Sequence, residues 1–430
     1  MFSRKIAVTS ARPHPSFSGR TMLGIGALTL FLSASAQTYG FSVFIDPMLD
    51  EFGWSRSLIS SAYTVATLIS AGVVFLGGNL IDRFGHRRVM VVTTVVYAAA
   101  LLLMGSVVNP ITLLLAFTLL RATGSSVLTL TGRTLVSQWF VRRRGRAVSL
   151  INLGKMLGMA AVPAGNALLI THVGWRDAWR VNALMVAGLV PLALLFVHSR
   201  PEDVGQYPDG VQPERETDAG GTSQPADERS WTLRQAMRTR VFWLLLSASI
   251  VPAMVTNGLS FHQISILTER GLSSTGAATI FAIESAVALP MTLVAGWLAD
   301  RFAPRYVLGL GQAALTLTMV SLIFVSSVET AVVFGVLRGI TTGTWILASE
   351  VAWPMYFGRR HLGSIVGMSF SISFVGAAIG PLPFGLIYDA VGSYDAAIWG
   401  LAAPSVLTAW AVLTAGTPSQ VAAQKSTSQP

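Results

Sequence analysis

Apolar segments long enough to cross a membrane recur along almost the whole of this 430-residue chain. A bilayer core about 30 Å thick needs about 20 mainly apolar residues per helix. Water is absent there, so backbone groups must be satisfied within helices or closed barrels. The sequence predicts an all-α integral membrane protein with twelve transmembrane helices, at 22–45, 58–81, 89–108, 111–135, 147–171, 178–197, 241–267, 277–299, 306–325, 331–355, 362–387 and 396–415.

Positive charge is concentrated in the connections between these segments. Most of the 30 Lys and Arg residues lie in the two termini and in every second connection. Because Lys and Arg in short loops stay on the cytoplasmic side, both termini are predicted to face the cytoplasm, in a multi-pass protein of the inner (plasma) membrane. The net charge of +10 therefore reflects topology, and we expect the lipid bilayer, not nucleic acid, as the partner surface.

An internal repeat divides the chain into two comparable halves. Gly78, Asp82 and Arg83 recur 218 residues later as Gly296, Asp300 and Arg301, and Arg121 recurs 217 residues later as Arg338. A polar stretch rich in Glu, Asp, Gly, Pro and Ser separates the halves and reads as a flexible linker. The predicted organisation is two pseudo-symmetric six-helix bundles: an N-terminal tail (1–20), a first bundle (21–198), a cytoplasmic linker (199–240), a second bundle (241–415) and a C-terminal tail (416–430).

One loop motif occurs in both halves. The first copy follows the second apolar segment, and the weaker second copy follows the eighth. Both resemble the signature of the major facilitator superfamily, which implies two rocking bundles and a conformational latch in this loop. The glycines would permit close helix approach. The latch residues are Gly78, Asp82, Arg83, Gly85, Arg87 and Arg88 in the first copy and Gly296, Asp300, Arg301 and Arg305 in the second.

A narrower resemblance links the chain to bacterial monocarboxylate and oxalate/formate-type transporters. It rests on the stretches 40–56, 261–271 and 356–363. The likeness implies a small organic anion, such as a carboxylate, as substrate. The sequence departs from this group at Thr292, where an arginine is usual, and in the absence of a lysine from the first and eleventh segments.

Three ionisable residues stand out inside apolar segments, where a charge costs at least about 2.5 to 3.5 kcal/mol. Arg121 lies near mid-membrane and resembles the family's helix-four arginine, implicated in substrate binding or proton coupling; the alternative is a structural arginine bonded to backbone carbonyls. Glu284 is a proton-coupling candidate or, alternatively, a permanently paired glutamate. Arg338 is a further candidate, although it could snorkel to the membrane surface.

A second group of charged residues suggests a gate. Arg133 and Glu350 occupy matching positions in the two halves, so a salt bridge between them could close the cytoplasmic side, with Lys155 as a competing partner. The alternative is that Arg133 pairs with Asp82 and Glu350 with Arg301, each within its own half.

Four polar or aromatic residues could line a central cavity: Gln37, Tyr39, Asn257 and His262. Each could instead serve packing, and His262 could lie on the surface.

The predicted function is secondary active transport of a small organic solute by alternating access, coupled to protons, in a monomer. The alternatives are a proton-antiport exporter and, from another class, a non-transporting membrane sensor. No clustered catalytic set and no G-x-x-x-x-G-K-[ST] phosphate loop occur in the sequence, so we predict no enzyme. The chain has no cysteine, which excludes thiolate metal sites, and we expect neither a metal nor a cofactor.

Overall fold

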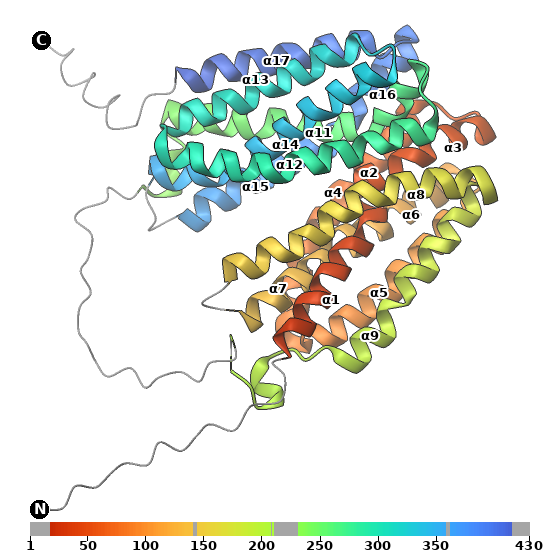
Figure 1. The fold of residues 1–430 in the computed structure, drawn as a ribbon, viewed down its shortest axis with the longest axis vertical. Helices are drawn as coiled ribbons and strands as arrows, with labels where there is room; N and C mark the ends of the chain where they lie inside the picture. The colour runs from red at the N-terminus through yellow and green to blue at the C-terminus, as the bar shows by residue number, and fades with distance from the viewer. Residues whose placement is uncertain (1–17, 141–143, 208, 210–230, 358–361, 415–430) are drawn as a thin grey trace, which may run out of the picture.

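The computed structural model describes residues 18–140, 144–207, 209, 231–357 and 362–414. Within these ranges the regular elements are helices, and Figure 1 shows them in two groups that follow the order of the chain. The first group contains α1 (Gly19–Leu32), α2 (Thr38–Phe41), α3 (Ile45–Phe52), α4 (Arg56–Phe84), α5 (His86–Met104), α6 (Pro110–Leu120), α7 (Thr129–Trp139), α8 (Arg144–Ala187) and α9 (Leu189–Phe196). After α10 (Leu233–Ala236), the second contains α11 (Arg240–Glu269), α12 (Ser274–Arg301), α13 (Pro304–Ile323), α14 (Val328–Phe357), α15 (Leu362–Ile379), α16 (Pro381–Val391) and α17 (Asp395–Leu413).

These helices supply twelve crossings. Among the described residues, nine helical stretches are long and apolar enough to span a bilayer, and the bent pair 19–36 and 38–52 makes a tenth. The stretch 146–196 turns at Gly174 (φ 80°, ψ 163°) and therefore crosses twice. The helix α14, whose side chains are described only in part, completes the set. The predicted twelve-helix, all-α membrane fold is confirmed.

The first crossing is not the continuous helix predicted at 22–45. The chain leaves the helix at Gln37 (φ −80°, ψ 159°), after a short 3-10 turn, η1 (Ser33–Ala36), and bends by 52° before continuing. Gly40 permits this path, because a Cβ there would lie 2.1 Å from the Ala34 carbonyl oxygen. The break removes the Ala36 carbonyl from the regular helical ladder and leaves it available to a side chain.

The fourth crossing also departs from a regular α-helix. Between α6 and α7 lies a π-helical segment, η3 (Arg121–Leu128), which begins at the predicted functional arginine. Such segments are rare and occur frequently at functional sites.

Three glycines on α14 bring it unusually close to α12. At Gly339 a Cβ would lie 2.7 Å from the Glu284 carbonyl oxygen, and Gly335 and Gly343 face the same helix one turn to each side. Small residues at such spacing allow helix backbones to approach. The close contact places the side chains of α12 and α14 within ion-pair reach.

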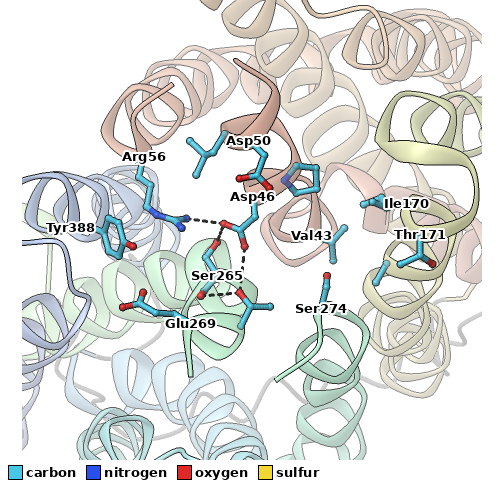
Figure 2. Close-up of a pocket in the computed structure, with 14 residues that line it drawn as sticks. Val43, Asp46, Asp50, Arg56, Ile170, Thr171, Ser265, Glu269, Ser274 and Tyr388 are labelled. Carbon is cyan, nitrogen blue, oxygen red and sulfur yellow. Dashed lines mark hydrogen bonds and ion pairs between the residues drawn. The ribbon is translucent and has the colours of Figure 1, made fainter. Parts of the chain in front are cut away.

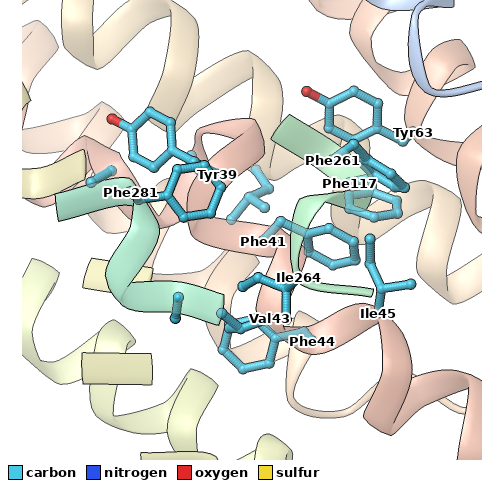
Figure 3. Packing of buried hydrophobic residues seen from close by; sticks show 14 of the residues in the cluster. Tyr39, Phe41, Val43, Phe44, Ile45, Tyr63, Phe117, Phe261, Ile264 and Phe281 are labelled. Atoms are coloured by element: carbon cyan, nitrogen blue, oxygen red, sulfur yellow. The ribbon is translucent and has the colours of Figure 1, made fainter. Parts of the chain in front are cut away.

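The two groups of helices converge near α3 and α16 and lie farther apart at the opposite ends, as the ribbons in Figure 1 show. Where they converge, aromatic side chains of the broken first crossing pack across the boundary. Phe41 lies 4.5 Å (ring centroid to ring centroid) from Phe117 in its own half and 5.6 Å from Phe261 in the other (Figure 3). We call this set of contacts between the halves, with the polar contacts below, the seam.

Candidate functional site

Arg121 forms the centre of the first half. Its Nε donates a hydrogen bond to Thr67 Oγ1 (3.2 Å), and Nη1 donates to the Ala36 carbonyl (3.1 Å), the group released by the helix break. The guanidinium carbon lies 4.9 Å from the centroid of the Tyr63 ring. The residue is 6% exposed, yet no described carboxylate lies within ion-pair distance of it. Arg121 is therefore a buried cation without a counter-charge among the described residues.

Glu284 and Arg338 form the centre of the second half. Arg338 Nε donates to Glu284 Oε2 at 2.6 Å, and the two side chains are only 3% and 2% exposed. Thr342 donates to the other carboxylate oxygen (2.8 Å), and Arg338 also donates to Ser260 Oγ. The alternative in which Arg338 snorkels to the surface is wrong, because the guanidinium is held inside by this pair. Its Nη1 is buried and has no hydrogen-bond partner among the described residues.

The broken first crossing lies between the two centres. Thr38 donates to Asn257 Oδ1 of the second half (2.6 Å) and lies 2.5 Å from the Tyr63 hydroxyl. Tyr39 packs its ring 6.1 Å from that of Phe281 and lies within electrostatic reach of Glu284. Its buried hydroxyl has no hydrogen-bond partner in the described part of the chain. Gln37 contributes the extended backbone position at the break and is half-buried.

His262 belongs to the seam and not to either centre. It is fully buried, so the surface alternative is wrong. Its Nε2 lies 3.2 Å from Ser60 Oγ of the first half and 3.0 Å from the Pro381 carbonyl, and its Nδ1 lies 3.1 Å from the Tyr394 hydroxyl.

The polar end of the seam surrounds a cavity of about 470 Å³ (Figure 2). Asp46 accepts from Arg56 (2.9 Å) and from Ser265 of the second half (2.7 Å). The Arg56 guanidinium in turn lies 4.6 Å from the ring centroid of Tyr388, also in the second half. Charge and aromatic contacts therefore join the halves at this end.

A carboxylate of the second half caps a helix of the first. Asp389 accepts from the backbone N–H groups of Arg56 (3.2 Å) and Ser57 (2.8 Å), at the start of α4. Free N–H groups and the helix dipole favour an anion there. Gly385, one turn earlier on α16, completes the fit, because a Cβ there would lie 2.8 Å from Ser60 Oγ.

The latch loop lies at the end of the first half away from the seam. Gly85 (φ 79°) both ends α4 and begins α5, a backbone conformation that favours glycine. Arg87 donates its backbone N–H to Ser199 Oγ (3.4 Å) and its guanidinium to the Leu194 carbonyl, whereas Asp82, Arg83 and Arg88 are exposed.

The first latch glycine makes no close contact with the described part of the chain in this conformation. A Cβ at Gly78 would meet no described atom within 4 Å, so close helix packing at that residue stays a prediction. In the second copy, Arg301 stacks 4.1 Å from the Trp297 ring centroid and Arg305 lies 4.8 Å from that of Tyr306. The side chain of Asp300 lies outside the described residues, and Gly296 is half-buried on α12.

The predicted gate falls partly outside the described residues. The Glu350 side chain is not among them, so its pairing with Arg133 or Arg301 stays a prediction. Arg133 is exposed on α7, and half-buried Lys155 on α8 lies within electrostatic reach of it.

The structure thus separates the candidate residues into two charged centres, a bridging segment and a seam. Sequence reasoning missed Thr67 and Thr342, neutral side chains that hold the two centres. It also missed Asp389 and Arg56. Both lie just beyond the ends of predicted helices, so neither stood out as a charge inside an apolar segment. Thr67 and Glu284 each precede their arginine by 54 residues, a regularity that could have pointed to Thr67.

A family model for the Major Facilitator Superfamily matches residues 25–273 and again 258–429, one match for each half. The chain belongs to the major facilitator superfamily. A gallate transporter of Pseudomonas putida is 26% identical over 81% of this chain and 84% of its own length. A 3-(3-hydroxy-phenyl)propionate transporter of Escherichia coli is 24% identical over 93% of this chain and 95% of its own.

The solved structures support the same fold. A crystal structure of the nucleoside transporter NupG superimposes with a TM-score of 0.70, at 13% identity, over 92% of this chain and 98% of that one. At this sequence identity the structural similarity supports the fold alone. A major facilitator chain of this build is a multi-pass membrane transporter of small solutes.

The seam makes a testable prediction about conformation. Asp389→Asn removes the charge that caps α4, an interaction worth about 1 to 2 kcal/mol when partly buried, so the population with an open seam should rise about five- to thirtyfold. Because the chain has no cysteine, Val43→Cys can report opening through its rate of alkylation by a maleimide. Val43 lines the cavity and is 1% exposed.

The matched control is Asp177→Asn, which removes an exposed carboxylate that pairs with Arg180 inside the first half and not with the second. Equal alkylation rates in the Asp389 and Asp177 variants would show that the cap does not hold the seam closed.

Proposed function

We propose that this chain is a secondary active transporter that carries a small organic anion, in the first instance a carboxylate, by alternating access. The observation that carries the proposal is the buried guanidinium of Arg121 without a described carboxylate beside it. An isolated buried charge costs several kcal/mol. A bound anion would supply the missing counter-charge, and Arg matches a carboxylate with paired N–H donors.

The relatives support an organic anion. Gallate and 3-(3-hydroxy-phenyl)propionate, the compounds for which two relatives are named, are both aromatic carboxylates. The Tyr63 ring beside Arg121 and the rings of Tyr39 and Phe281 would suit such a substrate. The narrower likeness to monocarboxylate and oxalate/formate-type carriers points to the same chemical class.

We assign proton coupling to Glu284. Its carboxylate is buried and forms an ion pair with Arg338. Movement of the halves that changes this pairing would load and release a proton. Tyr39, within reach of Glu284 and only three residues beyond Ala36, connects this centre to Arg121.

The seam would then be the outer gate. The termini and every second connection, which include both latch loops, carry most of the 30 Lys and Arg residues, and this bias favours the cytoplasm for that end. Contacts between Asp389 and α4 close the opposite side, so the conformation would be inward-facing. We further propose that the two bundles of a single chain, joined by the 199–240 linker, form the complete transport unit in the inner membrane.

Uptake into proteoliposomes tests the substrate class. Gallate, benzoate and 3-(3-hydroxy-phenyl)propionate are offered with a proton gradient, and accumulation should collapse with an uncoupler. Arg121→Gln should lower the initial rate at least about thirtyfold, because loss of a buried charge partner costs about 2 kcal/mol or more. Arg180→Gln, an exposed arginine at the surface, is the control. If Arg121→Gln transports anions like the control, the proposed role of Arg121 is wrong; if protons drive solute out of the lumen instead, the export alternative holds.

Coupling is tested separately at Glu284. Glu284→Gln should retain exchange of anion for anion but lose uphill accumulation, because glutamine cannot carry the proton. Glu329→Gln, an exposed glutamate near the start of α14, should keep both activities. Full accumulation by the Glu284 variant would remove this residue from the coupling mechanism.

A further inference from the structure

The two arginine centres are built on the same pattern with one difference. Thr67 and Glu284 each stand 54 residues before their arginine, and each accepts a hydrogen bond from its Nε: Thr67 from Arg121 at 3.2 Å and Glu284 from Arg338 at 2.6 Å. The equivalence rests on these contacts and on the repeat that relates the two arginines. The acceptor is a neutral hydroxyl in the first half and a carboxylate in the second.

This single difference sets the charge of each centre. In the second half the ion pair between Arg338 and Glu284 sums to zero. In the first half Thr67 fixes the orientation of Arg121 without cancelling its charge, and the second acceptor, the Ala36 carbonyl, is neutral as well. The Tyr63 ring offsets part of the cost of burying the guanidinium without neutralising its charge.

One nitrogen of the Arg121 guanidinium has no hydrogen-bond partner among the described residues. Nε and Nη1 are used by Thr67 and Ala36, whereas Nη2 makes no hydrogen bond to any described residue and is not among the fully buried polar atoms. The guanidinium is therefore held through two of its nitrogens, and the third is left open.

We propose that Thr67 is a specificity-determining residue, which makes the first half select an anion because it positions Arg121 without neutralising it. The inference rests on the proposed function and deepens it, since it names the residue that sets the sign of the accepted charge. A carboxylate at position 67 would reproduce the pair that Arg338 makes with Glu284. The substrate's carboxylate would then meet an arginine whose charge is already satisfied.

The test compares Thr67→Glu with Thr67→Gln in the full-length purified protein. Both side chains are longer than threonine and can accept from Arg121 Nε, but only glutamate carries a charge. Binding of gallate, benzoate and 3-(3-hydroxy-phenyl)propionate is measured by calorimetry, and the melting midpoint of each variant confirms that it is folded. We expect Thr67→Glu to bind the carboxylates at least about thirtyfold more weakly than Thr67→Gln, the effect of losing one buried charge partner. Thr67→Ser, which keeps the hydroxyl, should bind like the wild type.

The outcomes separate the two claims. If the wild type binds none of the three carboxylates, the proposed function fails. If the wild type and Thr67→Gln bind them and a folded Thr67→Glu binds equally well, only the role of Thr67 is overturned. If Thr67→Gln loses binding as completely as Thr67→Glu, the effect comes from side-chain size and the charge argument is likewise overturned.

Discussion

The guanidinium of Arg121 lies among membrane-spanning helices with neutral acceptors on two of its nitrogens and no described carboxylate beside it. Holding a full charge there costs several kcal/mol, which neutral hydrogen bonds offset only in part. Two contacts stabilise it: the Ala36 carbonyl, released where the helix breaks at Gln37, and the tyrosine ring on its face. A π-helical segment begins at the same arginine.

In the second half, an ion pair neutralises the buried arginine. Glycines on α14 bring it close enough to α12 for Glu284 and Arg338 to form an ion pair, and Thr342 and Ser260 add hydrogen bonds to it. The broken first crossing contacts both centres, because Ala36 accepts from Arg121 while Tyr39 packs against Phe281, one turn before Glu284 on α12. Discontinuous helices at mid-membrane are typical of substrate and ion sites in transporters. Movement of this segment would therefore change the contacts of both centres.

Hydropathy and the internal repeat were sufficient to predict the fold, since the cost of exposed backbone in lipid leaves few alternatives. The same reasoning identified Arg121, Glu284 and Arg338, because a charge inside an apolar segment is conspicuous. It did not find Thr67 or Asp389, whose roles depend on which helices become neighbours. The break at Gln37 was also missed, because the apolar run continues through it. The close approach of Gly40 to the Ala34 carbonyl becomes evident only in the structure. His262 was expected in a central cavity or on the surface, because its contacts in the seam also depend on which helices become neighbours.

Competition during exchange shows whether the first half recognises negative charge. Proteoliposomes loaded with the best-bound carboxylate, at equal pH on both sides, are offered its labelled form together with an excess of the same carboxylate, its amide or its amine analogue. These competitors share a shape and differ in charge. We expect the carboxylate alone to block exchange; inhibition by the amide or the amine as strong as that by the carboxylate would show that charge is not what the site recognises.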